Sequence, residues 1–193
     1  MDLSAIFQRA LRAGEFGPLQ DELSYVEAYL SLEKARMGER LEVICCGQRF
    51  QDDHLYHAES PLLEQPVPTL TIQPLVENAV IHGISKKPAG GTVTIDFQEE
   101  NGDLQVTVQD DGNGIPPERL AQILALVDES QPVSGASADL ISVDGPKSGH
   151  VSLGLRNIDS RLRALYGDAY RLRITSQPGE GTRVVVRVPM NSE

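Results

Sequence analysis

Tryptophan is absent from this sequence of 193 residues, and aromatic residues of all kinds make up only 5% of it. A core therefore has to be built from aliphatic side chains, which are plentiful because hydrophobic residues make up 40% of the chain. That content is too high for wholesale disorder. The length is that of one domain with room for an appendage.

Basic residues are also scarce, with 17 Lys and Arg against 28 Asp and Glu and a net charge of −11. DNA- and RNA-binding proteins neutralise phosphates with Lys and Arg, so this charge argues against nucleic acid as the main ligand. A single nucleotide is not excluded, because a metal ion and helix termini can supply positive potential locally.

The only two cysteines, Cys45 and Cys46, are adjacent. Neighbours in a strand point to opposite faces of a sheet, so neither a disulfide between them nor a shared metal is expected. Two reduced thiols fit the cytosol. No segment approaches the roughly 20 apolar residues of a membrane span, and the first ten residues lack the layout of a signal peptide. We therefore expect a soluble chain, either complete or a piece of a larger protein.

What the sequence does contain is a succession of helix and strand patterns. Leu19, Leu23, Val26 and Leu30 recur at spacings of three and four, which predicts a helix that ends near Gly38. The expected elements, in chain order, are helices over 3–13 and 18–36, a strand over 41–47, a weak strand near 55–56, a helix from Thr69 or Thr71 as its cap to Gly83, strands over 92–98 and 104–109, helices over 116–128 and 153–166, and strands over 170–176 and 182–189.

Leu104, Val106 and Val108 alternate with polar residues, which is typical of a sheet covered on one side only. Helices that bracket mostly antiparallel strands predict an α+β two-layer sandwich. Residues 129–149 are rich in Ser, Gly, Pro and Asp and have no period. A connection of this length is usually a functional lid or disorder.

The helix expected before Gly83 carries an acid and an amide side by side, Glu77 and Asn78, in an otherwise apolar stretch. An amide carbonyl can bind Mg²⁺, and a carboxylate can take a proton or position a nucleophile. On a helix Asn78 shares a face with His82, and Glu77 lies on the adjacent face. The alternative is a solvated polar face of an amphipathic helix.

Asp110 ends the strand that follows and is succeeded by Gly112 and Gly114. Its carboxylate can accept a hydrogen bond from an adenine amino group, and glycines let the backbone approach a ligand closely. The alternative is an ordinary Asp-Gly turn.

Two further segments suit a nucleotide site. Residues 152–157 (SLGLRN) open a helix whose free N–H groups favour phosphate, and Arg156 and Lys147 could add positive charge. The turn over 179–182 (GEGT) fits a bulged hairpin as well as it fits a direct role in nucleotide binding.

These four segments, in this order, resemble the N, G1, G2 and G3 boxes of the GHKL ATP-binding fold shared by gyrase, Hsp90, histidine kinases and MutL. The similarity is narrower still. Residues 27–41 (EAYLSLEKARMGERL), 73–83 (QPLVENAVIHG) and 154–162 (GLRNIDSRL) are similar to the cytoplasmic end of LytS-like sensor histidine kinases. The resemblance covers the chain from about residue 19 onward.

The resemblance implies ATP and Mg²⁺ as ligands. Asn78 would coordinate Mg²⁺, Glu77 would be the catalytic acid–base residue beside the γ-phosphate, and Asp110 would hydrogen-bond adenine. The other residues implied at the nucleotide site are His82, Gly112, Gly114, Ser152, Gly154, Leu155, Arg156, Gly179, Gly181 and Thr182.

The resemblance also implies a division of the chain. Residues 1–40 would be a helical leader from the end of the dimerisation region, and residues 41–193 the ATP-binding catalytic domain. Residues 118–150 would form a mobile lid over ATP. Two positions depart from the family: Ser152 replaces a usual glycine, and Ile81 stands where a basic residue is common.

The phosphoacceptor histidine that the family requires is missing, since none of His54, His57, His82 and His150 lies in the expected setting. We therefore expect the cytoplasmic catalytic part of a larger inner-membrane kinase, whose acceptor histidine and sensor lie upstream. It would phosphorylate that histidine for relay to a response regulator, and the leader's apolar stripe would favour a homodimer.

Three alternatives remain open for the function. Two use the same fold: an ATP-hydrolysing clamp of the gyrase or Hsp90 kind, and a serine kinase of the anti-sigma type. The kinase-like leader helix argues against both. The third is a non-catalytic module that binds a nucleotide or a protein, and the departures at Ile81 and Ser152 keep it open.

Overall fold

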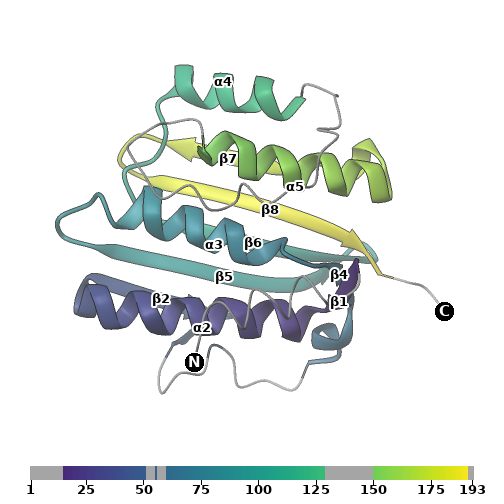
Figure 1. The fold of residues 1–193 in the computed structure, drawn as a ribbon, viewed down its shortest axis with the longest axis horizontal. Helices are drawn as coiled ribbons and strands as arrows, with labels where there is room; N and C mark the ends of the chain where they lie inside the picture. The colour runs from purple at the N-terminus through teal and green to yellow at the C-terminus, as the bar shows by residue number, and fades with distance from the viewer. Residues whose placement is uncertain (1–14, 51–54, 56–59, 129–149, 191–193) are drawn as a thin grey trace.

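The computed structural model describes residues 15–50, 55, 60–128 and 150–190. Their main feature is a six-stranded sheet in the order β3-β2-β5-β6-β8-β7 (Figure 1). β2 and β5 are parallel, and the other neighbouring pairs are antiparallel. The strands are β2 (Leu41–Cys45), β3 (Gln48–Arg49), β5 (Gly91–Glu100), β6 (Asp103–Asp110), β7 (Arg173–Gln177) and β8 (Gly181–Pro189).

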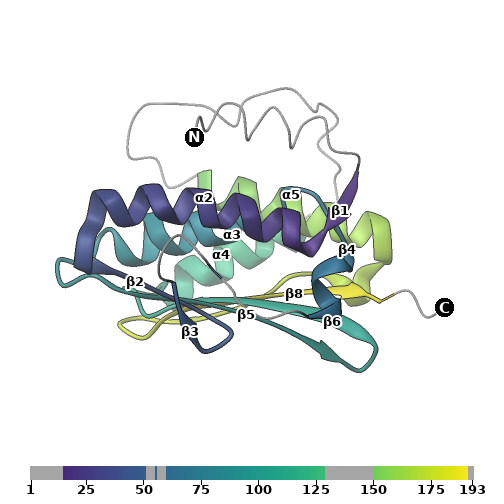
Figure 2. The same cartoon turned by 90° about the horizontal axis from the view of Figure 1, so that it is seen from below.

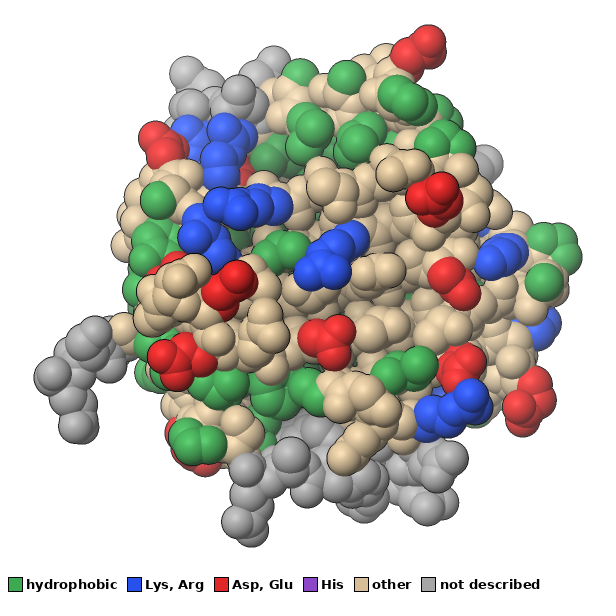
Figure 3. Space-filling view, turned by 180° about the vertical axis from the view of Figure 1, so that it is seen from behind, with side chains coloured by type: hydrophobic (Ala, Val, Ile, Leu, Met, Phe, Trp, Pro, Cys, Tyr) green, Lys and Arg blue, Asp and Glu red, His purple; other side chains and the backbone are tan. Residues whose placement is uncertain are grey.

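Helices cover one face of this sheet and leave the other open (Figure 2). They lie side by side in the order α2, α3, α5, α4 (Figure 1). The open face carries mainly polar side chains, with charges of both signs interspersed (Figure 3). The α+β two-layer sandwich is therefore confirmed. The helices are α2 (Leu19–Met37), α3 (Ile72–Asn78), which continues as the π-helix η3 (Ala79–Ile84), α4 (Pro117–Asp128) and α5 (His150–Tyr166).

The core lies between the two layers and is almost entirely aliphatic. On the central strand β6, Leu104, Val106 and Val108 are each at most 2% exposed, and on its neighbour Val93 and Ile95 are fully buried. The apolar face predicted for the strand over 104–109 is confirmed. Alternating strands bury one row of side chains, so the sheet needs only one helical layer.

Helix α2 contributes to this same core. Leu19, Leu23, Val26 and Leu30 are all 0% exposed, and Gly38 ends the helix with a φ of 61°, as predicted. The apolar stripe is thus used within the chain. These four side chains are therefore not exposed as a dimer face, and the homodimer of the intact kinase stays a prediction.

A second, two-stranded sheet joins the starts of two helices. β1 (Phe16–Pro18) pairs antiparallel with β4 (Pro66–Pro68), which places the beginning of α2 beside the segment that leads into α3. This sheet was not predicted, because proline in both segments is typical of turns and strand edges. Three short 3-10 helices complete the described elements: η1 (Gly38–Arg40), η2 (Pro61–Glu64) and η4 (Asp168–Tyr170).

Several boundaries differ from the prediction. The strand expected over 41–47 ends at Cys45, because Cys46 and Gly47 have φ of 47° and 76° and turn the chain into β3. Both thiols are free, as predicted, with Cys45 buried and Cys46 exposed. Helix α5 begins at His150, before its expected start, and the strand expected from residue 170 begins at Arg173, after η4.

The predicted threonine cap of α3 is wrong. Thr71 is at the N-cap position but makes no capping hydrogen bond, and its hydroxyl donates instead to the carbonyl of Pro68 at 2.7 Å. The carboxylate of Glu22, on α2, instead accepts the backbone N–H groups of Leu70, Thr71 and Ile72 at this helix start. A cap from a distant segment leaves no local sequence signal.

Some predictions fall outside the described residues. These are the helix over 3–13, His54, Tyr56 and His57, Lys147, and the irregular segment over 129–149. Among the helices that are described, none is both long enough and apolar enough to cross a membrane.

Candidate functional site

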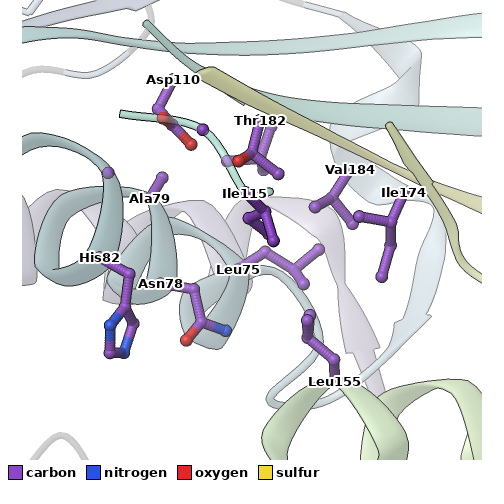
Figure 4. Close-up of a pocket in the computed structure, with 13 residues that line it drawn as sticks. Leu75, Asn78, Ala79, His82, Asp110, Ile115, Leu155, Ile174, Thr182 and Val184 are labelled. Carbon is purple, nitrogen blue, oxygen red and sulfur yellow. The ribbon is translucent and has the colours of Figure 1, made fainter. Parts of the chain in front are cut away.

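A cavity opens between the α3–η3 helix, α5 and the ends of β6, β7 and β8 (Figure 4). Its lining brings together six of the predicted site residues, which come from four separate segments. These are Asn78, His82, Asp110, Gly114, Leu155 and Thr182. The remaining lining residues were not singled out from the sequence and are mostly aliphatic: Leu75, Ala79, Gly83, Val108, Ile115, Ile174 and Val184.

Asp110, at the end of β6, is only 4% exposed although it is ionisable. Burial raises the pKa of its carboxyl to about 6, against the lowering effect of hydrogen bonds from the backbones of Gly112 and Thr182. The Gly112 N–H donates to Oδ1 at 2.9 Å. A carboxylate in an apolar recess gains most from a ligand that donates a hydrogen bond to it.

Two glycines make room for this carboxylate. A Cβ on Gly83 would lie 2.4 Å from Asp110 Oδ1, and a Cβ on Gly112 would lie 2.5 Å from the Gly83 backbone. Neither approach is compatible with a side chain. Gly83 therefore belongs to the site, and the sequence signal for it was its place at the end of the predicted helix.

The walls of the cavity are mainly aliphatic, and its described lining residues include no Phe, Tyr or Trp. Leu75 and Leu155 face each other from α3 and α5, while Ile174 and Val184 extend from the sheet (Figure 4). A slot with aliphatic walls and one convergent polar group is the usual form of a small-molecule site. A planar base with an amino group at its edge has matching chemistry.

Asn78 and His82 project from the same side of the α3–η3 helix, as predicted (Figure 4). Lys86 Nζ lies 3.4 Å from His82 Nδ1. Burial, aided by Lys86, lowers the pKa of His82, so its imidazole is neutral at pH 7. The cavity therefore has two neutral polar groups on this helix and one buried anion on the sheet.

An oxygen ligand for Mg²⁺ is available at Asn78. The described residues contain no group of three His, Cys, Asp or Glu side chains that could hold a metal by themselves. Mg²⁺ keeps several waters and commonly uses one or two protein ligands together with substrate phosphates. The residues present therefore fit a Mg²⁺ that arrives with a nucleotide and do not form a metal cage.

Glu77 does not line the cavity. Its Oε1 accepts a hydrogen bond from Gln73 Nε2 at 2.8 Å, one turn earlier on the same helix face. Its pKa is raised by burial first and by the negative charge of Glu33, which lies on α2. The side chain thus lies on the face of α3 toward α2, beside the nucleotide cavity rather than in it.

The third and fourth boxes, at residues 152–157 and 179–182, contribute unequally to the lining of the cavity. On α5, Leu155 lines the cavity, while Gly154 and Arg156 do not, and Ser152 lies in the first turn of that helix. Gly181 lies against the backbone of Asp110, where its φ of 102° and a Cβ distance of only 1.9 Å exclude a side chain.

Ser176 fixes the turn that precedes β8. Its hydroxyl accepts the Ile115 N–H at 2.8 Å and lies 2.9 Å from the hydroxyl of Thr182. The Gly179 N–H donates to the carbonyl of Asn113 at 2.8 Å. These bonds join the turn that follows β6 to the turn between β7 and β8, so that the two turns form one wall of the site. The sequence offered no signal for Ser176.

The fold and the cavity define a nucleotide-binding domain that has no Walker loop. The family model described as "Histidine kinase-, DNA gyrase B-, and HSP90-like ATPase" matches residues 66–192, and the chain belongs to this family of ATP-binding domains. The resemblance drawn from the four boxes is thereby confirmed.

Curated relatives narrow the comparison to sensor kinases. The chain is 32% identical to the sensor histidine kinase BtsS of Escherichia coli K12 over 99% of its length, and 33% identical to the sensor protein LytS of Bacillus anthracis over 89%. It spans 27% and 24% of those two proteins. The chain therefore corresponds to about a quarter of each relative.

Solved structures agree on the fold. The histidine kinase domain of the blue-light activated kinase EL346 from Erythrobacter litoralis matches with a TM-score of 0.52 at 20% identity, covering 98% of this chain and 76% of that one. The catalytic domain of the histidine kinase ThkA matches with a TM-score of 0.53 at 14% identity, covering 92% of this chain and 97% of that one.

Proposed function

We propose that this chain is the catalytic domain of a two-component sensor histidine kinase, which transfers the γ-phosphoryl group of ATP to a histidine outside the chain. The observation that carries the proposal is the cavity itself. It combines a buried carboxylate and an amide-bearing helix, both drawn from the boxes, with aliphatic walls. The similarity to BtsS and LytS supports the kinase reading over other members of the family.

Adenine would enter the apolar slot and donate its amino group to Asp110. Gly83 and Gly112 would keep that carboxylate accessible, and Leu155 would cover the base from α5. His82 would lie beside the sugar and phosphates as a neutral group. Gly154, Arg156 and the N–H groups at the start of α5 would face the phosphates, with residues 118–150 closing as a lid.

Mg²⁺ would be held by Asn78 together with the phosphates and water, and it would supply charge neutralisation for phosphoryl transfer. The chain's own part in the reaction would be positioning, which accounts for most of the catalysis in this chemistry.

Glu77 would orient or deprotonate the attacking imidazole. Its raised pKa moves it toward the range that suits a general base near neutral pH. Its place beside the cavity fits an acceptor that approaches over the α2–α3 face and meets the γ-phosphate at the edge of the pocket. Ile81, which is 45% exposed on the same helix face, would lie under that acceptor.

The remaining partners follow from the relatives. A response regulator would take the phosphoryl group from the histidine onto an aspartate, and a sensor upstream would anchor the whole kinase to a membrane. The intact kinase would be a homodimer through segments outside this chain. By itself the chain would be inactive, because it contains no acceptor histidine.

The first test is nucleotide binding by calorimetry, with and without Mg²⁺, followed by transfer to a supplied phosphoacceptor helix from a related kinase. We expect Asp110→Asn to abolish ATP and ADP binding, and Asn78→Ala to remove only the increment that Mg²⁺ adds. Glu77→Gln is expected to bind normally and transfer on the order of 100-fold more slowly. Glu100→Gln, an exposed acid-to-amide change on β5, is the matched control.

The outcomes separate the alternatives. Normal transfer by Glu77→Gln would show that its acid–base assignment is wrong. Tight binding without transfer to any supplied histidine would favour a non-catalytic module. Hydrolysis of ATP without an acceptor, lost in Glu77→Gln, would favour an ATPase of the clamp type.

A further inference from the structure

The start of α3 is held by an acid from another helix. Glu22, on α2, is 1% exposed, and its carboxylate accepts three consecutive backbone N–H groups, from Leu70 at 2.6 Å and from Thr71 and Ile72 at 2.9 Å. Helix starts leave such N–H groups without partners, and a carboxylate there is favoured by the helix dipole as well. A charged acceptor makes each of these bonds stronger than a neutral cap would.

The backbone at this point is unusual. Leu70 has a φ of 57°, a left-handed conformation that is strained for a residue with a Cβ. Such a conformation persists only where the surroundings enforce it. Here the Glu22 carboxylate enforces it by accepting hydrogen bonds from the N–H groups of Leu70, Thr71 and Ile72.

A third helix reaches the same turn. Arg161, on α5, donates from Nη2 to Thr71 Oγ1 at 2.6 Å, and Thr71 donates onward to the carbonyl of Pro68. Burial lowers the pKa of Arg161, and the negative charge of Glu22 opposes that lowering. The negative charge of Glu22 therefore favours the charged form of the half-buried Arg161 across the turn.

This turn lies six residues before Asn78, on a helix only seven residues long before its π-helical continuation. Asp110, which would bind the base, is on the sheet instead. A shift of the α3 start would move Asn78 relative to Asp110, whose carboxylate stays on the sheet. In phosphoryl transfer, misplacement by about 1 Å can cost on the order of 100-fold in rate.

We propose that Glu22 is a positioning residue for the phosphate half of the ATP site. Together with Arg161 it clamps the Leu70–Ile72 turn between α2 and α5, so that the position of α2 sets the position of Asn78. Upstream segments that move α2 would then change the affinity for Mg·ATP more than the affinity for adenosine. This inference rests on the proposed nucleotide site.

The test compares two ligands on the same protein. Adenosine engages the base site alone, whereas Mg·ATP also engages Asn78, so the ratio of the two dissociation constants isolates the phosphate half. We expect Glu22→Gln to leave adenosine affinity within about twofold and to reduce the Mg·ATP advantage about tenfold. A residue that only stabilises the fold would lower the unfolding midpoint and leave this ratio unchanged in the folded protein.

The chain offers a close control. Glu27 lies on the same helix, and its carboxylate also accepts a backbone N–H, in this case from Leu55 at 2.8 Å. Glu27→Gln should retain the full Mg·ATP advantage. If the wild-type chain binds both ligands and Glu22→Gln leaves the ratio unchanged, the positioning role is overturned. The proposed function is not affected by that result.

Two further measurements cover other outcomes. If Glu22→Gln does not fold, Arg161→Met tests the second arm of the clamp by the same ratio, and an unchanged ratio there overturns the proposal. Hydrogen exchange at the Leu70, Thr71 and Ile72 amides should slow further with Mg·ATP than with adenosine. Failure of the wild-type chain to bind adenosine would instead count against the proposed function.

Discussion

Asp110 shows how a single residue can be costly for the fold and suited to the ligand. Its carboxyl is buried at the inner end of an apolar cavity, and burial raises its pKa to about 6. In the free protein the ionised group has hydrogen bonds from two backbone N–H groups. A ligand amino group would add one more partner at the point where water is excluded.

We expect Asp110→Asn to stabilise the free protein at pH 7. A folded pKa of about 6 against 3.8 means that the folded state binds more protons between these values, so wild-type stability rises as pH falls through 6. The charge therefore costs at most about 3 kcal/mol at pH 7, and the amide removes that cost. Urea unfolding of both proteins at pH 7 and pH 5 measures it.

The matched control for that measurement is Asp96→Asn, because Asp96 is an exposed acid on β5. Its unfolding midpoint should not change. If Asp110→Asn proved less stable than the wild type at pH 7, the hydrogen bonds to the carboxylate would outweigh its desolvation.

The same pKa predicts how binding depends on pH. Protonation removes the negative acceptor, so adenosine affinity should be constant above pH 7 and fall below pH 6, approaching about tenfold per pH unit. Adenosine is the suitable ligand because it lacks titrating phosphates. Calorimetry between pH 5 and 8 measures this, and a profile that stays flat to pH 5 would mean that Asp110 does not contact the base.

Gly83→Ala tests the close packing around this carboxylate. The new Cβ would lie 2.4 Å from Asp110 Oδ1, so the carboxylate must move. We expect adenosine affinity to fall at least about tenfold, the loss expected when a group that binds the ligand is displaced. Gly17→Ala is the control, since its Cβ would meet only ordinary contacts, the nearest at 3.6 Å. Equal affinities for the two variants would contradict a direct role of Asp110.

Among the elements, α2 is the one whose role depends most on the structure. Its periodic leucines predicted the helix correctly, but periodicity cannot tell which surface an apolar stripe meets. In the folded chain the stripe meets the sheet and the helix also supplies Glu22 to α3. The division of the chain at residue 40 stays a prediction, and α2 provides the means to test it.

We expect Leu23→Ala to cost about 2–5 kcal/mol of stability, the range for a leucine truncated in a packed core. Leu32→Ala on the same helix is the control, because Leu32 is 50% exposed and its loss should cost little. Chemical denaturation of both variants measures the difference. Similar small effects would mean that α2 is an attached leader rather than part of the catalytic domain.

The sequence predicts those elements whose determining residues lie within the element itself. β6 was predicted because its alternation is local, and the helix over 116–128 because the proline at its start is a local signal too. The pairing of β1 with β4, the cap from Glu22 and the wall tied by Ser176 all join residues far apart in the chain. Propensity and spacing contain no information about such contacts, so only the folded structure reveals them.

The residues of the site also divide into those that the sequence predicts and those that it does not. The polar groups of the cavity, Asn78 and Asp110, were predictable because their neighbours form recognisable boxes. The aliphatic walls were not, since Leu75 or Val184 looks like any other core residue in the sequence. Glu77 was assigned beside the γ-phosphate, and its exclusion from the cavity lining follows from a helix rotation of about 100° per residue.

At the scale of the whole molecule, the two layers bury most of the large apolar side chains. Among the described residues only Phe16, Leu32, Ile81 and Leu124 are large, hydrophobic and exposed. The open face of the sheet is polar and carries both signs of charge (Figure 3). Stable dimers bury well over 1,000 Å² of complementary surface, and four exposed apolar side chains offer little basis for that.

We therefore expect this chain to be a monomer at micromolar concentration. Its net charge of −11 adds mutual repulsion, which screening by salt reduces. Sedimentation equilibrium at 0.05 and 0.5 M NaCl, with and without Mg·ATP, measures the mass directly. A monomer throughout would assign dimerisation of the intact kinase to segments outside the chain. A dimer that Leu32→Glu or Ile81→Glu dissolves would instead place an interface on the α2–α3 face, where it would compete with the histidine that Glu77 is proposed to serve.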